Sequence, residues 1–143
     1  MRITSSAFEN GAMIPEKYTC DGENISPPLT IVDIPKEAKS LVLIADDPDA
    51  PMGTWTHWIV WNITVKNIGI EENSAPGTEG RNTSGKEGYS GPCPPSGIHR
   101  YFFKVYALDN ILENKIGASR KEIEQSMEGH VIAESVLMGR YGR

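Results

Sequence analysis

Cysteine is scarce in this sequence of 143 residues: only Cys20 and Cys93 are present, far apart in the chain. Neither has a second cysteine close to it, so the spacing of a zinc site and the cysteine framework of a disulfide-rich domain are both absent. We therefore expect two free thiols.

Long apolar runs are also absent. No stretch approaches the roughly 20 apolar residues that a membrane-spanning helix requires, and residues 1–9 lack the apolar run of a signal peptide. We therefore expect a cytoplasmic protein without a transmembrane segment.

Positive charge is in deficit, because 14 Lys and Arg stand against 19 Asp and Glu and give a net charge of −5. This balance offers no overall attraction for nucleic acid or for an anionic membrane surface. We expect no nucleic-acid partner, and an anionic ligand would have to be held by local groups.

Glycine and proline are abundant, at 14 and 10 residues, while hydrophobic residues make up 38% of the chain. No internal repeat or low-complexity tract is present. The glycine and proline clusters fall between short apolar runs, a pattern typical of strands joined by structured loops. A chain of this length can bury one ordinary core. We therefore expect a mainly β fold in a single domain over residues 1–143.

Three segments have the features of strands. Ser40 to Ala45 is an apolar run that ends at a loop with two prolines, and residues 55–64 and 99–108 follow a period of two. In the second segment, one predicted face holds Trp55, His57, Ile59, Trp61 and Ile63. In the third, one predicted face holds His99, Tyr101, Phe103, Val105 and Ala107.

One segment indicates a helix of about ten residues: Ser119 can act as N-cap, Glu122 completes a capping box, and Gly129 provides the stop. Residues 130–141 are ambiguous between a strand and a second helix, and we favour a final strand.

The chemistry-bearing residues centre on two histidines. His57 and His99 each begin a predicted strand after a loop rich in proline or glycine, so they share an end of the sheet if their strands run in the same direction. Such a parallel pair needs a long crossover, and residues 65–98 are long enough to provide one. Asp47 precedes the His57 strand and could orient an imidazole. The alternative is that both histidines are structural and that Asp47 belongs to ordinary turn chemistry.

Two other ligand sites can be weighed on the same residues. Residues 80–86 match most of a phosphate-binding loop, but Glu87 stands where Ser or Thr should bind magnesium, so we reject nucleotide hydrolysis. Two histidines and an aspartate could bind a metal ion, but a site with Tyr101 and a glycine- and proline-rich rim suits an anion at least as well. We expect neither a metal nor a cofactor.

Several segments resemble the phosphatidylethanolamine-binding protein family. Asp47 to Pro51, followed by Trp55 to Trp58, and Gly91 to Tyr101 are similar to its two signature regions. Three further segments resemble the compact prokaryotic branch often called Raf-kinase-inhibitor-like: Lys17 to Gly22, Ser26 to Leu29 and Gly129 to Glu134.

This resemblance implies a fold and a site. The fold would be a large central β-sheet packed on a smaller sheet, mainly antiparallel, with one or two short helices near the C-terminal part. A cavity at one end of the large sheet would bind phosphate-like anions or phosphorylated head groups. The residues that fall where the family lines its pocket are Asp47, Pro51, Trp55, His57, Gly91, His99 and Tyr101.

The residue types fit an anion site better than a nucleophile site. Imidazole N–H groups, the Tyr101 hydroxyl and backbone amides near Gly91 can donate to phosphate oxygens, with Asp47 orienting a histidine. Ser96, the hydroxyl of that loop, lacks the strand-to-helix elbow of a hydrolase. Arg100 points away on the pleat and is expected to pair with Asp49 or another loop acid.

We therefore expect a binding protein rather than an enzyme, one that modulates a protein partner and is a monomer or a homodimer. The alternatives are an esterase-like hydrolase, and a protease or kinase inhibitor that acts through its surface. We also expect a cis peptide in the proline-rich loops, at Ala50–Pro51 or within Cys93 to Pro95.

Overall fold

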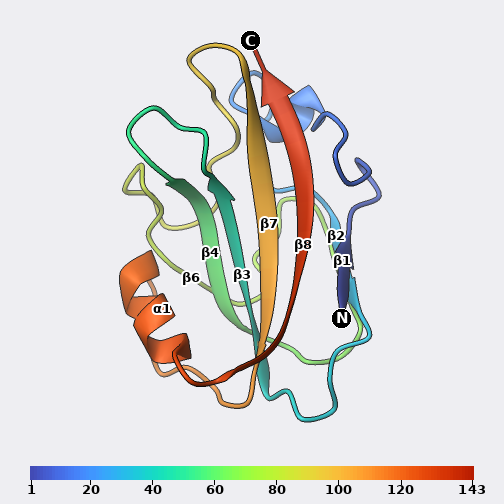
Figure 1. Cartoon of the computed structure of the whole chain (residues 1–143), viewed down its shortest axis with the longest axis vertical. Helices are drawn as coiled ribbons and strands as arrows, with labels where there is room; N and C mark the ends of the chain where they lie inside the picture. The colour runs from blue at the N-terminus through green and yellow to red at the C-terminus, as the bar shows by residue number, and fades with distance from the viewer.

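A computed structural model describes all residues, 1–143. Its elements are β1 (Arg2–Thr4), the 3₁₀ helix η1 (Glu16–Tyr18), β2 (Leu29–Val32), β3 (Ser40–Asp47), β4 (Trp55–Ile63), β5 (Ile68–Ile70), β6 (Thr78–Glu79), β7 (Ile98–Leu108), α1 (Arg120–Met127) and β8 (Val131–Gly142). The strands form a five-stranded sheet of order β6-β4-β3-β7-β8 and a three-stranded sheet of order β1-β2-β5 (Figure 1). All strand pairs in both sheets are antiparallel.

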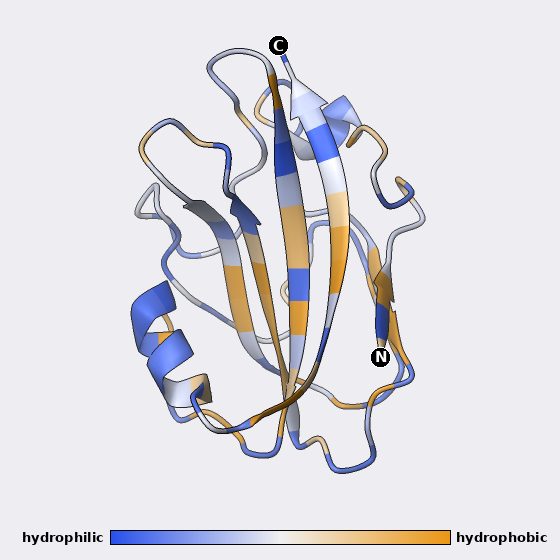
Figure 2. Cartoon of the chain, viewed as in Figure 1, coloured by the Kyte–Doolittle hydropathy of each residue, from blue (hydrophilic) through white to orange (hydrophobic).

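The larger sheet is covered on both faces, which explains its apolar central strand. A core of 20 buried residues lies between the two sheets, and a second core of 8 lies between the larger sheet and α1. All eight positions of β3 are buried, as the apolar run from Ser40 predicts. Figure 2 shows apolar residues along the middle of the large sheet and hydrophilic residues on α1.

The alternation predicted for residues 55–64 is wrong at two places, because β4 contains two irregularities in its pairing with β3. Ala45 pairs with Trp58 and Asp46 with Thr56, so His57 is an extra residue in β4. A bulge of this kind lets consecutive side chains point to the same side. Trp58 accordingly packs in the core between the sheets, on the side where His57 also lies.

The second irregularity lies near Asn62, whose φ is 56°. Ile59 and Trp61 pack under α1, whereas Ile63 packs in the core between the sheets. The side-chain amide of Asn62 donates to the carbonyl of Leu112 at 2.7 Å. The predicted face that joined His57, Ile59, Trp61 and Ile63 is therefore divided between the two cores.

The remaining predictions of elements are confirmed. In β7, Tyr101, Phe103, Val105 and Ala107 share the core face, as the period of two predicts. Ser119 caps α1 with both hydrogen bonds of a capping box, and Ile123 and Met127 are its buried residues. Residues 131–142 form a strand rather than a second helix. No helix has the length and the apolar character needed to cross a bilayer.

The proline-rich loops contain no cis peptide bond, so that prediction is wrong. Glycine supplies the sharp turning instead: Gly53, in the loop between β3 and β4, has a φ of 110°, and Gly97, before β7, has a φ of 71°. Glycine adopts such positive φ values without the steric cost that a Cβ atom adds.

Candidate functional site

The two histidines lie at the same end of the large sheet. β4 and β7 both run antiparallel to β3, which lies between them, so they are parallel to each other without being neighbours. The crossover between them includes β5 of the smaller sheet and β6 at the edge of the larger one. The loops that precede β4 and β7 meet at this end, together with the C-terminus (Figure 1).

A cavity of about 380 Å³ opens here. It is lined by all of the residues that the sequence indicated: Asp47, Pro51, Trp55, His57, Gly91, His99 and Tyr101. Its further lining residues, which sequence reasoning gave no role in the site, are Cys20, Asn24, Ala50, Ser84, Ser90, Cys93, Pro94 and Pro95. Five of those eight, Cys20, Ala50, Cys93, Pro94 and Pro95, lie in the segments that carry the family resemblance.

His99 is oriented by Asp47. Its Nδ1 lies 2.7 Å from Oδ2 of Asp47, and both residues are buried. The other oxygen of Asp47 accepts the backbone N–H of Asp49 at 2.7 Å. Because Nδ1 donates to the carboxylate, Nε2 is the ring nitrogen of His99 that can meet a ligand in the cavity. The predicted orienting role of Asp47 is thus matched by a direct contact.

His57 is held differently, by a backbone carbonyl. Its Nδ1 lies 2.7 Å from the carbonyl oxygen of Ser90. A carbonyl only accepts, so Nδ1 carries a proton, and Nε2 of the neutral ring is an acceptor. Burial lowers the pKa of His57 below its ordinary value, despite the opposing effects of the Ser90 carbonyl and of Asp47. The ring is therefore neutral at pH 7.

Tyr101 lies between the two imidazoles. Its ring meets His57 edge-on at 5.3 Å between centroids and stacks beside His99 at 6.5 Å. Burial, with the nearby Asp47 carboxylate, raises the pKa of Tyr101, so the hydroxyl keeps its proton. That hydroxyl has no hydrogen-bond partner in the protein.

Asn24 and Gly91 fix the part of the cavity wall that adjoins Ser90. The Oδ1 of Asn24 accepts the backbone N–H of Gly91 at 2.8 Å, so this amide is not the free anion donor that we expected. A Cβ on Gly91 would overlap the carbonyl oxygen of Tyr18. Glycine is therefore required here by close packing of two backbones.

A cluster of hydrogen-bonded polar side chains around Asn82 holds this part of the wall in place. The buried side-chain amide of Asn82 donates to the carbonyl oxygens of His57 and Gly88 and to the hydroxyl of Ser90. Ser84 donates to Oδ1 of Asn82 at 2.6 Å. The cluster fixes the Ser90 carbonyl that holds His57.

The rim is tied by an ion pair between two loops. Arg100 donates to Asp49 from its backbone N–H, Nε and Nη2, at 2.8 to 2.9 Å. The Arg100 guanidinium holds the pKa of Asp49 at about 2. This confirms the partner expected for Arg100. Nearby, Trp55 is 37% exposed and Met52 is 97% exposed, so the mouth also has an apolar side.

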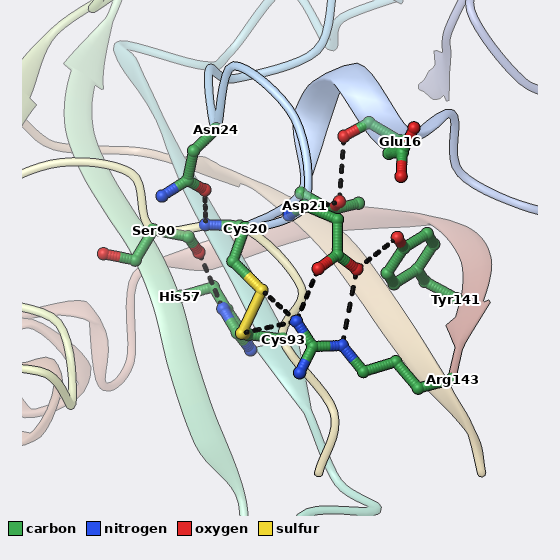
Figure 3. The surroundings of a disulfide bond; sticks show 11 residues. Glu16, Cys20, Asp21, Asn24, His57, Ser90, Cys93, Tyr141 and Arg143 are labelled. Atoms are coloured by element: carbon green, nitrogen blue, oxygen red, sulfur yellow. Dashed lines mark hydrogen bonds and ion pairs between the residues drawn. A yellow bond between two sulfur atoms is a disulfide. The ribbon is translucent and has the colours of Figure 1, made fainter. Parts of the chain in front are cut away.

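The cysteines are joined in a disulfide, and the expectation of two free thiols is wrong. Two hydrogen bonds join the chain after η1 to the loop before β7. The N–H of Cys20 donates to the carbonyl of Pro92 at 3.1 Å, and the Tyr89 hydroxyl donates to the carbonyl of Tyr18 at 2.7 Å. Figure 3 shows the disulfide beside Arg143. Distance along the sequence gave no sign of this proximity.

A cation site was weighed from the sequence as an alternative. No group of three or more His, Cys, Asp or Glu side chains is placed to hold a metal ion. Both carboxylate oxygens of Asp47 already accept hydrogen bonds, one from His99 and one from the Asp49 amide.

The chain is similar to known proteins over nearly its whole length. A sequence profile described as phosphatidylethanolamine-binding protein matches residues 4–142. The chain belongs to this family. A UPF0098 protein from Methanothermobacter thermautotrophicus is 51% identical over 100% of this chain and 99% of its own length. A UPF0098 protein from Chlamydia trachomatis is 47% identical over 99% and 98% of the two chains.

Solved structures of the family have the same fold. The crystal structure of a phosphatidylethanolamine-binding protein homologue, CT736, from Chlamydia trachomatis has a TM-score of 0.96 and 45% identity, and covers 99% of this chain and 97% of its own. YbcL from E. coli, described as a member of the mammalian family, has a TM-score of 0.91 and 29% identity, and covers 99% and 98%. The predicted fold, two β-sheets with a short helix, is thus confirmed.

Proposed function

We propose that the cavity binds a small phosphoryl anion, either inorganic phosphate or a phosphorylated head group, between His57 and His99. The observation that carries this proposal is the complementary orientation of the two rings. Each Nδ1 is engaged by the protein, so each ring has only Nε2 left for a ligand.

The two Nε2 atoms have different roles. A proton on Nε2 of His99 makes that ring an imidazolium whose charge lies beside the Asp47 carboxylate, and the ring then donates to an anionic oxygen. Nε2 of neutral His57 accepts, so it pairs with a hydroxyl on phosphorus. The Tyr101 hydroxyl adds a second donor. A singly protonated phosphate provides both kinds of group, acceptor oxygens and one P–OH.

Asp47 does not prevent anion binding by this arrangement. Its carboxylate accepts hydrogen bonds from His99 and from the Asp49 amide. These two donors partly offset its negative charge. An imidazolium at His99 would compensate the remaining charge.

Ester hydrolysis is less well supported by the same contacts. Two serines line the cavity, but Ser84 and Ser90 are hydrogen-bonded within the Asn82 cluster, and neither hydroxyl is bonded to a histidine nitrogen. The pairing of nucleophile with base that covalent catalysis uses is therefore not formed. Ser96 is not among the lining residues.

Isothermal titration of inorganic phosphate at pH 6.5 tests the proposal. We expect saturable binding by the wild-type protein and a loss of at least about tenfold in affinity for His99→Ala, which removes a charge-assisted hydrogen bond. His130→Ala is the matched control, because His130 pairs with Asp109 at an exposed site outside the cavity. Absence of binding by the wild type, or equal affinities in all three proteins, would refute the proposal.

We further propose that the protein acts in the cytoplasm, as a monomer or a homodimer, and modulates a protein partner. Disulfides are rare in the cytosol of mesophiles but common inside hyperthermophiles. Alkylation of cell extracts shows whether Cys20 and Cys93 are oxidised in the cell, and this result bears on the location.

Light scattering after gel filtration, with and without phosphate, measures the oligomeric state.

A further inference from the structure

The disulfide forms part of the cavity wall, a position that anion binding alone does not explain. Cys20 and Cys93 both line the cavity. Cys93 is exposed and Cys20 is half-buried. We propose that the Cys20–Cys93 disulfide is a site of thiol–disulfide exchange with a dithiol reductant, and that its reduction releases residues 93–95 from the cavity wall.

The two sulfur atoms differ in access and in electrostatic surroundings. The Arg143 Nη2 lies 3.2 Å from Sγ of Cys20 and 3.7 Å from Sγ of Cys93 (Figure 3). A guanidinium stabilises a thiolate, and a thiolate that is stabilised in this way leaves faster in exchange. Because Cys93 is the more exposed residue of the pair, an incoming thiolate attacks its sulfur, and Cys20 is the leaving group.

The exchange proceeds in two balanced steps. A thiolate of the dithiol forms a bond to Sγ of Cys93 while the Cys20–Cys93 bond breaks, and its electron pair goes to Sγ of Cys20 beside Arg143. The second thiolate of the reductant then attacks the other reductant sulfur, the one that is bonded to Cys93 in the mixed disulfide. Cys93 leaves as a thiolate. The protein disulfide gains two electrons, and the dithiol becomes a disulfide.

Arg143 is fixed in position by two sets of contacts. Its side chain pairs with Asp21, which also accepts from the Tyr141 hydroxyl. Its backbone exchanges hydrogen bonds with Gly97, at 3.1 and 3.2 Å. The guanidinium is therefore held beside the disulfide at the end of β8, and this end also borders the loop before β7.

Reduction affects this loop because little else holds it. The carbonyl of Pro92 accepts from Cys20 and Gly97 is bonded to Arg143, but between them no backbone hydrogen bond is formed by residues 93–96. Pro94 and Pro95 line the cavity beside Cys93. The disulfide is thus the one covalent link that fixes the middle of this wall, and any effect on anion binding rests on the function proposed above.

Exchange kinetics test the chemical step. The folded protein is mixed with dithiothreitol, and free thiols are trapped by iodoacetamide and counted by mass spectrometry. We expect Arg143→Gln to slow reduction by roughly threefold to tenfold, because the leaving thiolate loses its cation. Arg140→Gln is the matched control, since Arg140 is exposed on the same strand and bonds to the Gly11 carbonyl, and it should react at the wild-type rate.

The release of the loop is measured separately, without ligand. Amide hydrogen exchange at residue 20 and at Gly97, whose N–H groups donate to the carbonyls of Pro92 and Arg143 at the two ends of this segment, is compared in the oxidised protein, the reduced protein and the Cys20→Ser/Cys93→Ser variant. We expect faster exchange in the latter two, while the amides of β3 stay unchanged. Equal exchange in all three proteins overturns the proposal, as does a disulfide that dithiothreitol cannot reduce while the protein stays folded, or equal reduction rates in wild type and Arg143→Gln.

Phosphate titration of the oxidised and reduced forms then connects the two proposals. A lower affinity in the reduced form supports control of the cavity by the disulfide, and equal affinities overturn that control. Absence of phosphate binding in both forms refutes the proposed function, whereas the kinetics and the hydrogen exchange still decide the redox proposal.

Discussion

The Oδ2 of Asp47, the last residue of β3, lies 2.7 Å from Nδ1 of His99, the second residue of β7, and both side chains are at least 90% buried. This contact connects two neighbouring strands at the end of the sheet where the cavity opens. It fixes both the tautomer and the direction of the His99 ring. Asp46, one residue earlier, instead faces α1 and pairs with Lys104 and Arg120.

The double acceptor role of Asp47 predicts the effect of replacing it by asparagine. An amide has one oxygen, so in Asp47→Asn either His99 or the Asp49 amide loses its acceptor. We expect the free energy of unfolding to fall by about 1–3 kcal/mol, measured by urea denaturation at pH 7. Asp109→Asn is the control, because its contact with His130 is exposed and should contribute less than about 1 kcal/mol. An equal effect of both substitutions would contradict the role given to burial.

The pH dependence of stability follows from His57. Burial lowers its pKa in the folded protein, whereas in the unfolded chain it titrates near 6.5. The unfolded state therefore binds more protons between these two values, so stability is highest above pH 6.5 and falls as the pH drops toward the folded pKa. We expect His57→Gln to flatten this part of the profile, measured by urea denaturation from pH 5 to pH 8.

The exposed His130 provides the comparison for this profile. His130→Gln should leave the slope that belongs to His57 in place. A wild-type profile that shows no fall in stability below pH 6.5, or one that His57→Gln does not change, would contradict the desolvation of His57.

Much of this site could be predicted from the sequence, for reasons of local pattern. The period of two in residues 99–108 predicts the face of β7 that carries His99 and Tyr101, and the apolar run from Ser40 predicts a buried strand. The capping box at Ser119 fixes the start of α1. These signals are local, so they remain valid without knowledge of the tertiary contacts.

The rest depended on contacts between distant segments. The bulge at His57 arises from pairing with Ala45 and Asp46 in β3, which period-two counting cannot detect. The Cys20–Cys93 bond and the Asn24–Gly91 hydrogen bond both join the chain after η1 to the loop before β7. The family resemblance pointed to seven of the fifteen lining residues, but not to which nitrogen, amide or hydroxyl was free for a ligand.

The close packing at Gly91 predicts a large effect of one methyl group. In Gly91→Ala the Cβ would meet the Tyr18 carbonyl and the Asn24 side chain, so backbone must shift. We expect a loss of about 1–3 kcal/mol in the free energy of unfolding, as for overpacked sites. Gly69→Ala is the control, because no atom lies within 4 Å of its added Cβ. Equal stability of the two variants, measured by thermal unfolding, would contradict this account.

The acceptor role of His57 predicts a preference for phosphate over sulfate. Nε2 of the neutral ring can accept from a P–OH group, but sulfate carries no proton between pH 5.5 and 8 and would place an oxygen lone pair against that nitrogen. We expect phosphate to bind at least about tenfold more tightly than sulfate at pH 6, since an unpaired acceptor costs about 1–3 kcal/mol. The preference should persist at pH 8, because phosphate that has lost its second proton is singly protonated and keeps one P–OH group, whereas sulfate has none. Calorimetric titration of both anions at pH 6 and pH 8 measures it, and sulfate binding as tight as phosphate at pH 6 would mean that His57 meets the ligand as a donor.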